Sequence, residues 1–323
     1  MKTGVLLFNL GGPETLADVK PFLYNLFSDP EIIRIKFTPL RKTVAFMIAT
    51  LRKKKSSGYY AQIGGGSPLR RLTEEQARSL QDELRRRGHD AETFVGMITW
   101  RPFFDETLAQ IEKSKVERLV VLPLFPHFSV TTTGSGFSLL RRLIEKYPRV
   151  KSLKTEWIKT WKDHPSYIEA FALSIERELK KFANPQKAHL LFSAHSIPES
   201  YVKNGDPYLD ETKQTVELIM DRLGRKNTYQ LSFQSKIGPV KWLDPFTNDV
   251  IIDLGKRGVH DVLVIPISFV SEHIETLYEL DILYKHVAED AGVKNFRRVP
   301  ALNSDPAFIS ALADLVERAL KAG

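Results

Sequence analysis

The stretch Leu190-Leu191-Phe192-Ser193-Ala194-His195-Ser196-Ile197-Pro198 decides the interpretation of this chain, because it joins an apolar run to a histidine and a proline. The apolar run predicts a strand buried in a parallel sheet, and the proline predicts the turn that ends it. We therefore expect His195 at the carboxyl edge of the sheet, where open α/β sheets bind their ligands. A neutral imidazole there can accept a proton or bind a metal ion. A histidine that is merely hydrogen-bonded at a strand end is the competing interpretation.

A second apolar run, at residues 262–269, is followed by an acidic segment that begins at Ser271. If that segment is helical, a rotation of about 100° per residue places Glu272, Glu275 and Glu279 within roughly 60° of one another. A solvated acidic helix face is the competing interpretation. The stripe nevertheless starts just after a buried strand in the same half of the chain as His195. A histidine and carboxylates at one sheet edge suit both Fe²⁺ binding and proton transfer.

The composition limits the class of protein. The 323 residues are 42% hydrophobic, which is enough for one large or two medium cores and predicts one or two domains. No run of about 18 apolar residues is present, and the chain starts without a signal-peptide pattern, so we expect a cytoplasmic protein. The absence of cysteine excludes disulfides, thiolate zinc sites and a cysteine-held iron–sulfur cluster.

The net charge of +8 predicts attraction to an anionic partner. Nucleic acid, phospholipid headgroups and a substrate that carries carboxylates all fit this charge. Basic clusters at residues 52–55 and 85–87 are not accompanied by an RNP, helix-turn-helix or zinc-finger pattern, so nucleic acid is not expected. The sequence gives no indication of the oligomeric state.

Strand and helix patterns alternate in both halves of the chain, which predicts an α/β fold. We expect two similar Rossmann-like, doubly wound domains, each with a parallel β-sheet flanked by helices, and a cleft between them. The predicted limits are residues 1–159 for the first domain and residues 160–305 for the second, which contains His195 and Glu275. Residues 306–323 are predicted to form a helix that packs back on the first domain.

Residues 27–55 are too apolar for an ordinary loop, and two interpretations of them are open. The segment is either a helical excursion packed on the core or an exposed apolar lip. Two glycine-rich turns, at residues 11–15 and 64–68, flank this region. Neither turn carries a G-x-G-x-x-G pattern or a Walker lysine, so tight turns explain them as well as a nucleotide site does. The second turn would allow a ligand to approach the backbone closely.

Taken together, these segments resemble the ferrochelatase family, whose members insert ferrous iron into a porphyrin at the last step of heme synthesis. The matching blocks run in family order from near residue 4 to near residue 315. They lie at residues 9–15, 63–68, 132–135, 192–198, 205–208, 234–239, 242–243 and 273–281.

The resemblance implies insertion of Fe²⁺ into protoporphyrin IX, which gives protoheme and releases two protons. It implies that His195 and Glu275 are catalytic and bind the metal, backed by Glu272 and Glu279. The metal is a substrate, and no iron–sulfur cluster is expected. We expect an imidazole and acidic side chains that face each other across a gap the size of a tetrapyrrole.

The resemblance also implies a porphyrin pocket and a membrane contact. The porphyrin-binding residues implied are Leu10, Arg52, Tyr60, Ser67, Phe125, Lys236 and Trp242. Residues 27–55 would be the apolar lip of the active site and would dip into a membrane interface, with residues 52–55 at headgroup level.

The chain departs from the family pattern at Ile98 and Thr99, where many relatives have an arginine and a tyrosine. Trp100 and Arg101 are hypothetical partial substitutes. Two alternative functions remain open, namely a coproporphyrin III ferrochelatase and a tetrapyrrole-binding protein without catalysis. A Ser-His hydrolase is a poor third, because no G-x-S-x-G elbow is present.

Overall fold

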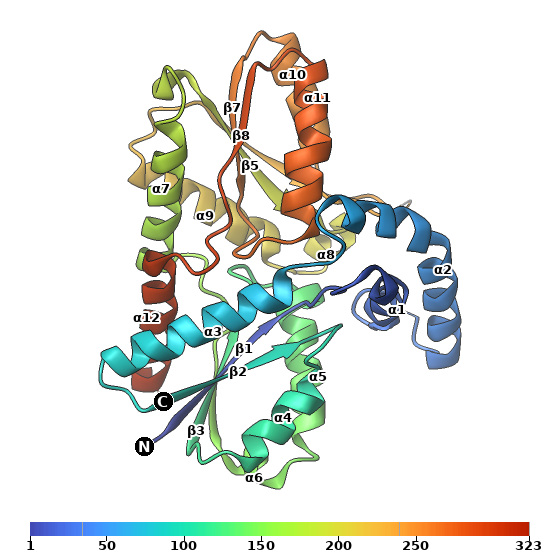
Figure 1. Cartoon of the computed structure of the whole chain (residues 1–323), viewed down its shortest axis with the longest axis vertical. Coiled ribbons are helices and arrows are strands. Elements are labelled where there is room, and N and C mark those ends of the chain that lie inside the picture. Colours follow the sequence, from blue (N-terminus) through green and yellow to red (C-terminus); the bar gives the residue numbers. More distant parts are fainter. Residues whose placement is uncertain (34, 239, 323) are drawn as a thin grey trace. The chain divides into compact units, whose positions relative to one another are not determined.

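The computed structural model describes residues 1–33, 35–238 and 240–322, which fold into two compact units (Figure 1). The first unit comprises residues 1–160 and the end of the chain from residue 312. The second unit comprises Trp161–Ala311. Each unit is built around its own four-stranded parallel sheet.

The first sheet has the strand order β2-β1-β3-β4. Its strands are β1 (Thr3–Asn9), β2 (Ala91–Met97), β3 (Arg118–Pro123) and β4 (Lys154–Trp157). All residues of β1 are buried, as expected for a central strand whose sheet is covered on both faces. The helices of the first unit are η1 (Leu16–Asp18), α1 (Val19–Ser28), α2 (Thr38–Gln62), α3 (Leu69–Arg86), α4 (Phe104–Lys113), η2 (Val130–Gly134), α5 (Ser135–Ile144) and α6 (Pro148–Ser152).

Helices cover both faces of the first sheet. Phe94 belongs to a core cluster that includes Phe8 and residues of α4 and α5. Its neighbour Thr93 donates to the carbonyl of Ala77 in α3 (3.0 Å). Successive strand residues point to opposite faces, so α3 lies on the face opposite α4 and α5.

The second sheet repeats this arrangement, with the order β6-β5-β7-β8. Its strands are β5 (His189–His195), β6 (Tyr229–Gln234), β7 (Asp261–Pro266) and β8 (Asn295–Arg298). The prediction of two similar, doubly wound parallel sheets is confirmed. The remaining helices are α7 (Pro165–Leu179), η3 (Pro185–Lys187), α8 (Glu199–Lys203), α9 (Tyr208–Arg222), α10 (Thr247–Lys256), η4 (Glu275–Leu283), α11 (Tyr284–Asp290) and α12 (Pro306–Ala322).

Both sheets have a point where the strand order reverses, which is where doubly wound sheets bind ligands. In the second unit that point lies between β5 and β7, because β6 pairs with β5 on the other side. Leu190, Leu191 and Phe192 of β5 are fully buried. This apolar core fixes the strand end, and therefore His195, at the reversal point.

The acidic segment that begins at Ser271 is not a single α-helix. Residues 271–273 are not helical, η4 is a π-helix, and only then does the α-helix α11 begin. Thr276 and Leu280 are buried on the core side of η4. Since π-helices are rare and concentrate at functional sites, this segment is a candidate part of the functional site.

The apolar segment at residues 27–55 is helical and also exposed. Helices α1 and α2 pack against each other, and Pro39 stands in the first turn of α2, where proline is tolerated. Among the described residues, no helix has the length and apolar character needed to cross a bilayer. Exposed apolar side chains on and just before α2 are Phe37, Leu40, Phe46, Met47 and Leu51.

The two glycine-rich turns touch each other, which explains two of their glycines. A Cβ atom at Gly66 would lie 2.0 Å from the carbonyl oxygen of Glu14. A Cβ atom at Gly12 would lie 2.7 Å from Ser67, whose amide donates to the Pro13 carbonyl (2.7 Å). Gly66 and Gly12 are therefore needed for the close approach of two chain segments.

We expect Gly66→Ala to destabilise the first unit by about 2 kcal/mol, because the new methyl group overlaps backbone that cannot move away freely. Gly58→Ala is the matched control. Gly58 lies inside α2 with no atom near its missing Cβ, so alanine there should stabilise the helix by about 0.5–1 kcal/mol. Urea unfolding followed by circular dichroism measures both changes, and equal stabilities of the two variants would contradict this packing.

Candidate functional site

The carboxyl edge of the second sheet gathers polar side chains from three elements. His195 is the last residue of β5, and it pairs in register with Gln234, the last residue of β6. The π-helix η4 starts at Glu275, after the loop that follows β7. The expectation that His195 lies at the carboxyl edge of its sheet is confirmed.

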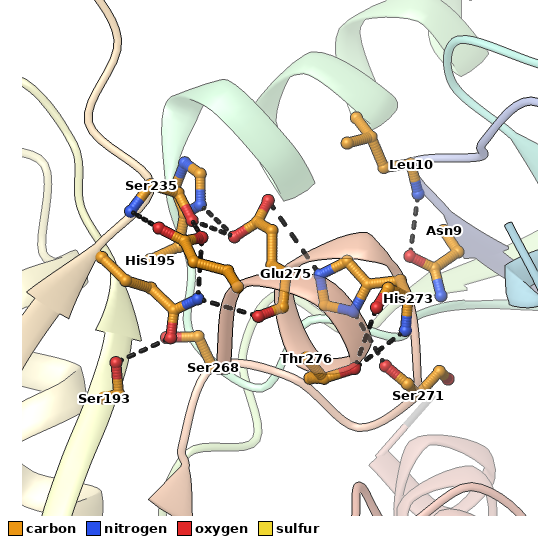
Figure 2. A network of polar contacts seen from close by, with 12 residues as sticks. Asn9, Leu10, Ser193, His195, Ser235, Ser268, Ser271, His273, Glu275 and Thr276 are labelled. Atoms are coloured by element: carbon orange, nitrogen blue, oxygen red, sulfur yellow. Dashed lines mark hydrogen bonds and ion pairs between the residues drawn. The ribbon is translucent and has the colours of Figure 1, made fainter. Parts of the chain in front are cut away.

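His195 and Glu275 are in direct contact. The imidazole Nδ1 lies 2.7 Å from Glu275 Oε2, and Figure 2 shows the two side chains turned toward each other. The predicted tetrapyrrole-sized gap between them is therefore wrong. The start of η4 is held against the sheet because Gln234 Nε2 donates to the backbone carbonyl of Glu275 (3.1 Å). This bond brings the carboxylate to the end of β5.

The surroundings of His195 and Glu275 shift their pKa values in opposite directions. Burial lowers the pKa of His195, but the charge of Glu275, the hydrogen bond to it and the charge of Glu279 outweigh burial and raise that pKa above its ordinary value. Burial raises the pKa of Glu275, and His195 reverses this effect and holds it well below its usual range. A proton on His195 is therefore stabilised by a carboxylate that stays ionised.

The other imidazole nitrogen is available for chemistry. The contact to Glu275 engages Nδ1, and no described residue hydrogen-bonds Nε2. About a third of the side chain is exposed (35%). When Nδ1–H donates to the carboxylate, Nε2 carries the lone pair that can accept a proton or bind a metal ion.

Ser235 and Gln234, which sequence reasoning missed as site residues, hold the carboxylates. Ser235 Oγ lies 2.8 Å from Glu275 Oε2 and also contacts Glu279 Oε2. Gln234 Nε2 donates to Glu279 Oε2 (3.0 Å). Gln234 ends β6, the strand that pairs with β5, and Ser235 follows it directly; that position was the available signal.

Glu279 is the second carboxylate of this cluster. Burial and the charge of Glu275 raise its pKa, while hydrogen bonds from Ser235, Tyr284 and Gln234 act in the opposite direction. The Tyr284 hydroxyl donates to Glu279 Oε1 (2.8 Å). The structure therefore brings His195, Glu275 and Glu279 together, as the sequence predicts.

His273 is a further histidine near the pair, and it was not predicted as a site residue. Its Nε2 lies 4.0 Å from Glu275 Oε1, which is beyond hydrogen-bond distance. Burial lowers its pKa even though Glu275 acts to raise it, so the ring favours the neutral form. Its Nδ1 lies 3.1 Å from the Ser271 carbonyl. Figure 2 shows His273 on the opposite side of Glu275 from His195.

Glu272 does not join this cluster, which corrects the predicted acidic stripe. It precedes η4, so it does not share a helical face with Glu275 and Glu279. Its Oε1 instead accepts hydrogen bonds from Arg298 Nη1 (2.8 Å) and from the amide of Ala301 (3.0 Å). These bonds, with Glu272 N donating to Asn303 Oδ1 (3.0 Å), hold residue 272 in a turn instead of a helix.

Within the described ranges, no group of three or more histidine, aspartate or glutamate side chains is arranged to hold a metal ion. His195 and Glu275 alone form a two-residue set of nitrogen and oxygen donors. Such a set suits a borderline divalent ion, but it lacks the three or four protein ligands of a resident site.

Two predicted pocket residues lie in the loop after β6. Lys236 Nζ lies 3.6 Å above the Phe246 ring. Trp242 forms an isolated antiparallel bridge with Pro198, and the amide of Leu243 donates to the Ile197 carbonyl (3.0 Å). The end of this loop is therefore fastened to the chain that immediately follows His195.

The other predicted porphyrin-binding residues belong to the first unit. The Leu10 amide donates to Asn9 Oδ1 (2.8 Å), and Phe125 packs edge-on against Phe8 (6.0 Å between ring centroids). Tyr60 is buried, whereas the Arg52 guanidinium lies 5.9 Å from the Phe27 ring. Ser67 lies in the turn that contacts Gly12.

The positions that depart from the family pattern have structural partners. Ile98 is part of the core cluster, and the Thr99 hydroxyl donates to the Leu10 carbonyl (2.7 Å). Trp100 is nearly buried and packs edge-on against Phe22. The fourth residue, Arg101, forms an ion pair with Glu106. These contacts hold the segment that follows β2 in place.

Comparisons with known proteins agree with the geometry. The sequence model of the family described as Ferrochelatase matches residues 2–320. The chain is 53% identical over 316 residues to a ferrochelatase of Synechocystis sp., covering 98% of this chain and 82% of that protein. It is 52% identical over 320 residues to a ferrochelatase of Synechococcus sp., covering 99% and 83%.

A solved structure shares the fold. It is the sirohydrochlorin chelatase of Bacillus subtilis subspecies spizizenii in complex with cobalt. The TM-score is 0.55 at 10% sequence identity, and the match covers 99% of this chain and 95% of that chain. At this identity the likeness supports the two-sheet architecture alone.

We expect the Glu275→Gln variant to lower the pKa of the His195 imidazole below its ordinary value of about 6.5. The carboxylate that favours the imidazolium is then lost, while the burial that disfavours it remains. Nitrogen-detected NMR of the histidine rings measures the pH midpoint of the His195 titration. Glu272→Gln is the control, because Glu272 binds Arg298 and should move the His195 midpoint much less. Equal shifts in both variants would contradict the arrangement.

Proposed function

The chain belongs to the ferrochelatase family, and we propose that it inserts Fe²⁺ into protoporphyrin IX to give protoheme and two protons. Its membership makes it a metal chelatase, a lyase of heme biosynthesis. The observation that carries the finer proposal is the contact of His195 with Glu275 at the reversal point of the second sheet. The substrate and the steps below follow from the chemistry of these side chains.

Metal insertion requires a base, because two pyrrole protons must leave the porphyrin. His195 Nε2 is the proposed proton acceptor. Glu275 fixes the ring orientation through Nδ1 and stabilises the imidazolium that forms, as a carboxylate does for histidine in hydrolytic triads. The exposed part of the imidazole allows the proton to pass to solvent after each transfer.

Metal delivery requires weak binding, since a closed cage of strong ligands would retain the ion. Among the described residues, none hydrogen-bonds Glu275 Oε1, and His273 Nε2 lies 4.0 Å from it, so this oxygen is the proposed ligand. His195 Nε2 is the proposed nitrogen ligand before it accepts a proton. Two ligands of this kind hold Fe²⁺ loosely and release it to four pyrrole nitrogens.

The porphyrin contacts are proposals from the family resemblance. Apolar faces of the macrocycle would contact Leu10, Phe125 and Trp242. The propionate groups would bind the cationic and hydroxyl side chains, namely Arg52, Lys236, Ser67 and Tyr60. A site that favours a bent macrocycle would bind the insertion transition state more tightly than the flat substrate.

Optical spectroscopy of the purified protein with Fe²⁺ or Zn²⁺ and protoporphyrin IX tests the proposal through loss of the free-base bands. Coproporphyrin III is the second substrate in the same assay. The apolar residues 27–55 favour protoporphyrin, so faster turnover of coproporphyrin III would replace the proposed substrate. Tight porphyrin binding without metal-dependent turnover would identify a carrier.

We expect His195→Ala and Glu275→Ala each to lower the rate of metal insertion by about 10²–10⁴-fold, because each removes part of the proton-accepting pair. Porphyrin binding, followed by quenching of Trp fluorescence, should be retained. His286→Ala is the control, since this histidine is 72% exposed on α11. Turnover close to that of the wild type in either site variant would refute the assignment.

We further propose that the protein acts in the cytoplasm and touches the membrane surface through α2. The exposed apolar residues of this segment lie near the basic residues 52–55, and Leu51 is 82% exposed. Apolar side chains beside cationic ones are typical of segments that lie in the headgroup region of an anionic membrane. A contact of this kind would receive a poorly soluble porphyrin from the bilayer.

We expect Met47→Ser with Leu51→Ser to weaken binding to vesicles of phosphatidylglycerol and phosphatidylcholine by about tenfold or more, because two apolar side chains no longer enter the interface. Co-sedimentation at fixed protein concentration measures the change. Leu173→Ser in α7 is the matched control, because Leu173 is also an exposed leucine, at 38%. Equal losses in both variants, or no binding by the wild type, would refute the contact.

A further inference from the structure

We propose that Ser235 is a positioning residue for Glu275, and that Glu279 acts through Ser235 instead of acting on the metal or the porphyrin. The inference rests on the proposed function, because it assumes that Glu275 works with His195. It concerns one hydroxyl group that touches both carboxylates of the site. Figure 2 shows Ser235 directed at Glu275.

The backbone of Ser235 is in a conformation that serine rarely adopts. Its φ angle is 68°, in the left-handed region that favours glycine. The amide in this conformation donates to Glu279 Oε1 (3.0 Å), while the hydroxyl reaches Glu275 Oε2. A non-glycine residue held in this region is strained, and such strain persists where the surroundings fix it. Here the two carboxylates fix it.

Glu279 has little capacity left for a metal ion or a travelling proton. Its Oε1 accepts from the Ser235 amide (3.0 Å) and from the Tyr284 hydroxyl (2.8 Å). Its Oε2 accepts from Gln234 Nε2 (3.0 Å) and contacts the Ser235 hydroxyl. A carboxylate offers about two lone-pair sites on each oxygen, so three donors and the shared hydroxyl occupy them all.

Glu275 differs in the way its two oxygens are used. His195 Nδ1 and the Ser235 hydroxyl both bind Oε2, at 2.7 and 2.8 Å. No hydrogen bond from the described residues reaches Oε1, and His273 Nε2 lies 4.0 Å from it. Ser235 therefore helps to fix one oxygen of Glu275 and leaves the other oriented for a ligand.

The Ser235 hydroxyl has one proton for two carboxylates. It can donate to Glu275 Oε2 or to Glu279 Oε2, but not to both at once. The position of this one hydroxyl therefore affects both carboxylates, and it links Glu279 to Glu275.

Buried hydrogen bonds fix the orientation of the Gln234 amide that supports this arrangement. Gln234 Oε1 accepts from the Ser193 hydroxyl (2.6 Å), and Ser193 Oγ lies 2.7 Å from Thr247 Oγ1. Gln234 and Ser193 are almost fully buried. The amide nitrogen must therefore face Glu279 and the Glu275 carbonyl. The orientation of the Gln234 amide is therefore fixed by the protein itself and does not depend on a bound substrate.

Substitutions of Ser235 separate positioning from stability. We expect Ser235→Ala and Ser235→Gly to lower kcat/KM for Zn²⁺ by about 10–100-fold, the usual effect of losing a residue that orients a metal ligand. The KM for protoporphyrin should change less than about twofold. Ser235→Gly should also raise the thermal midpoint, because glycine relieves the left-handed backbone. A variant that is more stable and less active cannot be explained by damage to the fold.

Ser174→Ala is the matched control, since Ser174 is a buried serine of α7 that takes no part in the hydrogen bonds described above. It should keep kcat/KM near the wild-type value. An active wild-type enzyme with unchanged Zn²⁺ kinetics in Ser235→Gly would overturn the positioning role alone. An inactive wild-type enzyme would instead overturn the proposed function.

A double-mutant cycle tests whether Glu279 acts through Ser235. Glu279→Gln replaces one carboxylate oxygen by an NH₂ group, which cannot accept the hydrogen bonds that Glu279 receives. This variant alone should therefore lower kcat/KM for Zn²⁺. If Glu279 acts through Ser235, the Glu279→Gln, Ser235→Ala double variant should show a loss of kcat/KM no larger than that of the more strongly affected single variant. Multiplied losses would show that Glu279 acts independently and would overturn this part of the proposal.

Discussion

The contact between His195 Nδ1 and Glu275 Oε2 is the interaction on which the arrangement of the candidate site depends. It joins the end of a central strand to the first residue of a π-helix, so it exists only if both elements reach the same sheet edge. The apolar residues of β5 and the buried Leu280 of η4 hold the elements in place. The hydrophobic core of the second unit therefore determines the charge state of the site, because it sets the distance between imidazole and carboxylate.

Much of the fold could be predicted from sequence, because buried parallel strands appear as continuous apolar runs. The position of His195 followed from the same pattern. The π-helix could not be predicted, because arithmetic at 3.6 residues per turn assumes an α-helix. Glu272 was placed wrongly because the helix begins only after it. Ser235 was missed for another reason. It lies 40 residues from Glu275, and its left-handed backbone leaves no signal in its residue type.

The two units share a strand order but differ in what they place at the reversal point. Asn9 ends β1 as His195 ends β5, and each strand has seven residues. Asn9 uses its side chain to cap the amide of Leu10 (2.8 Å). A π-helix also follows the third strand in each unit, η2 in the first and η4 in the second. At the same position of the two similar sheets, the second unit therefore has the imidazole–carboxylate pair of His195 and Glu275. The first unit has Asn9, whose side-chain amide binds a backbone amide.

The wide turns of η4 make the number of residues between its two glutamates part of the site. Its backbone bonds run from residue i to i+5, as the Tyr284 amide shows when it donates to the Glu279 carbonyl. Removing one residue between Glu275 and Glu279 would change the angle between their side chains around the helix axis, and both side chains contact Ser235. A deletion here would therefore change the direction in which the later side chains of the helix point, even if every functional side chain were retained.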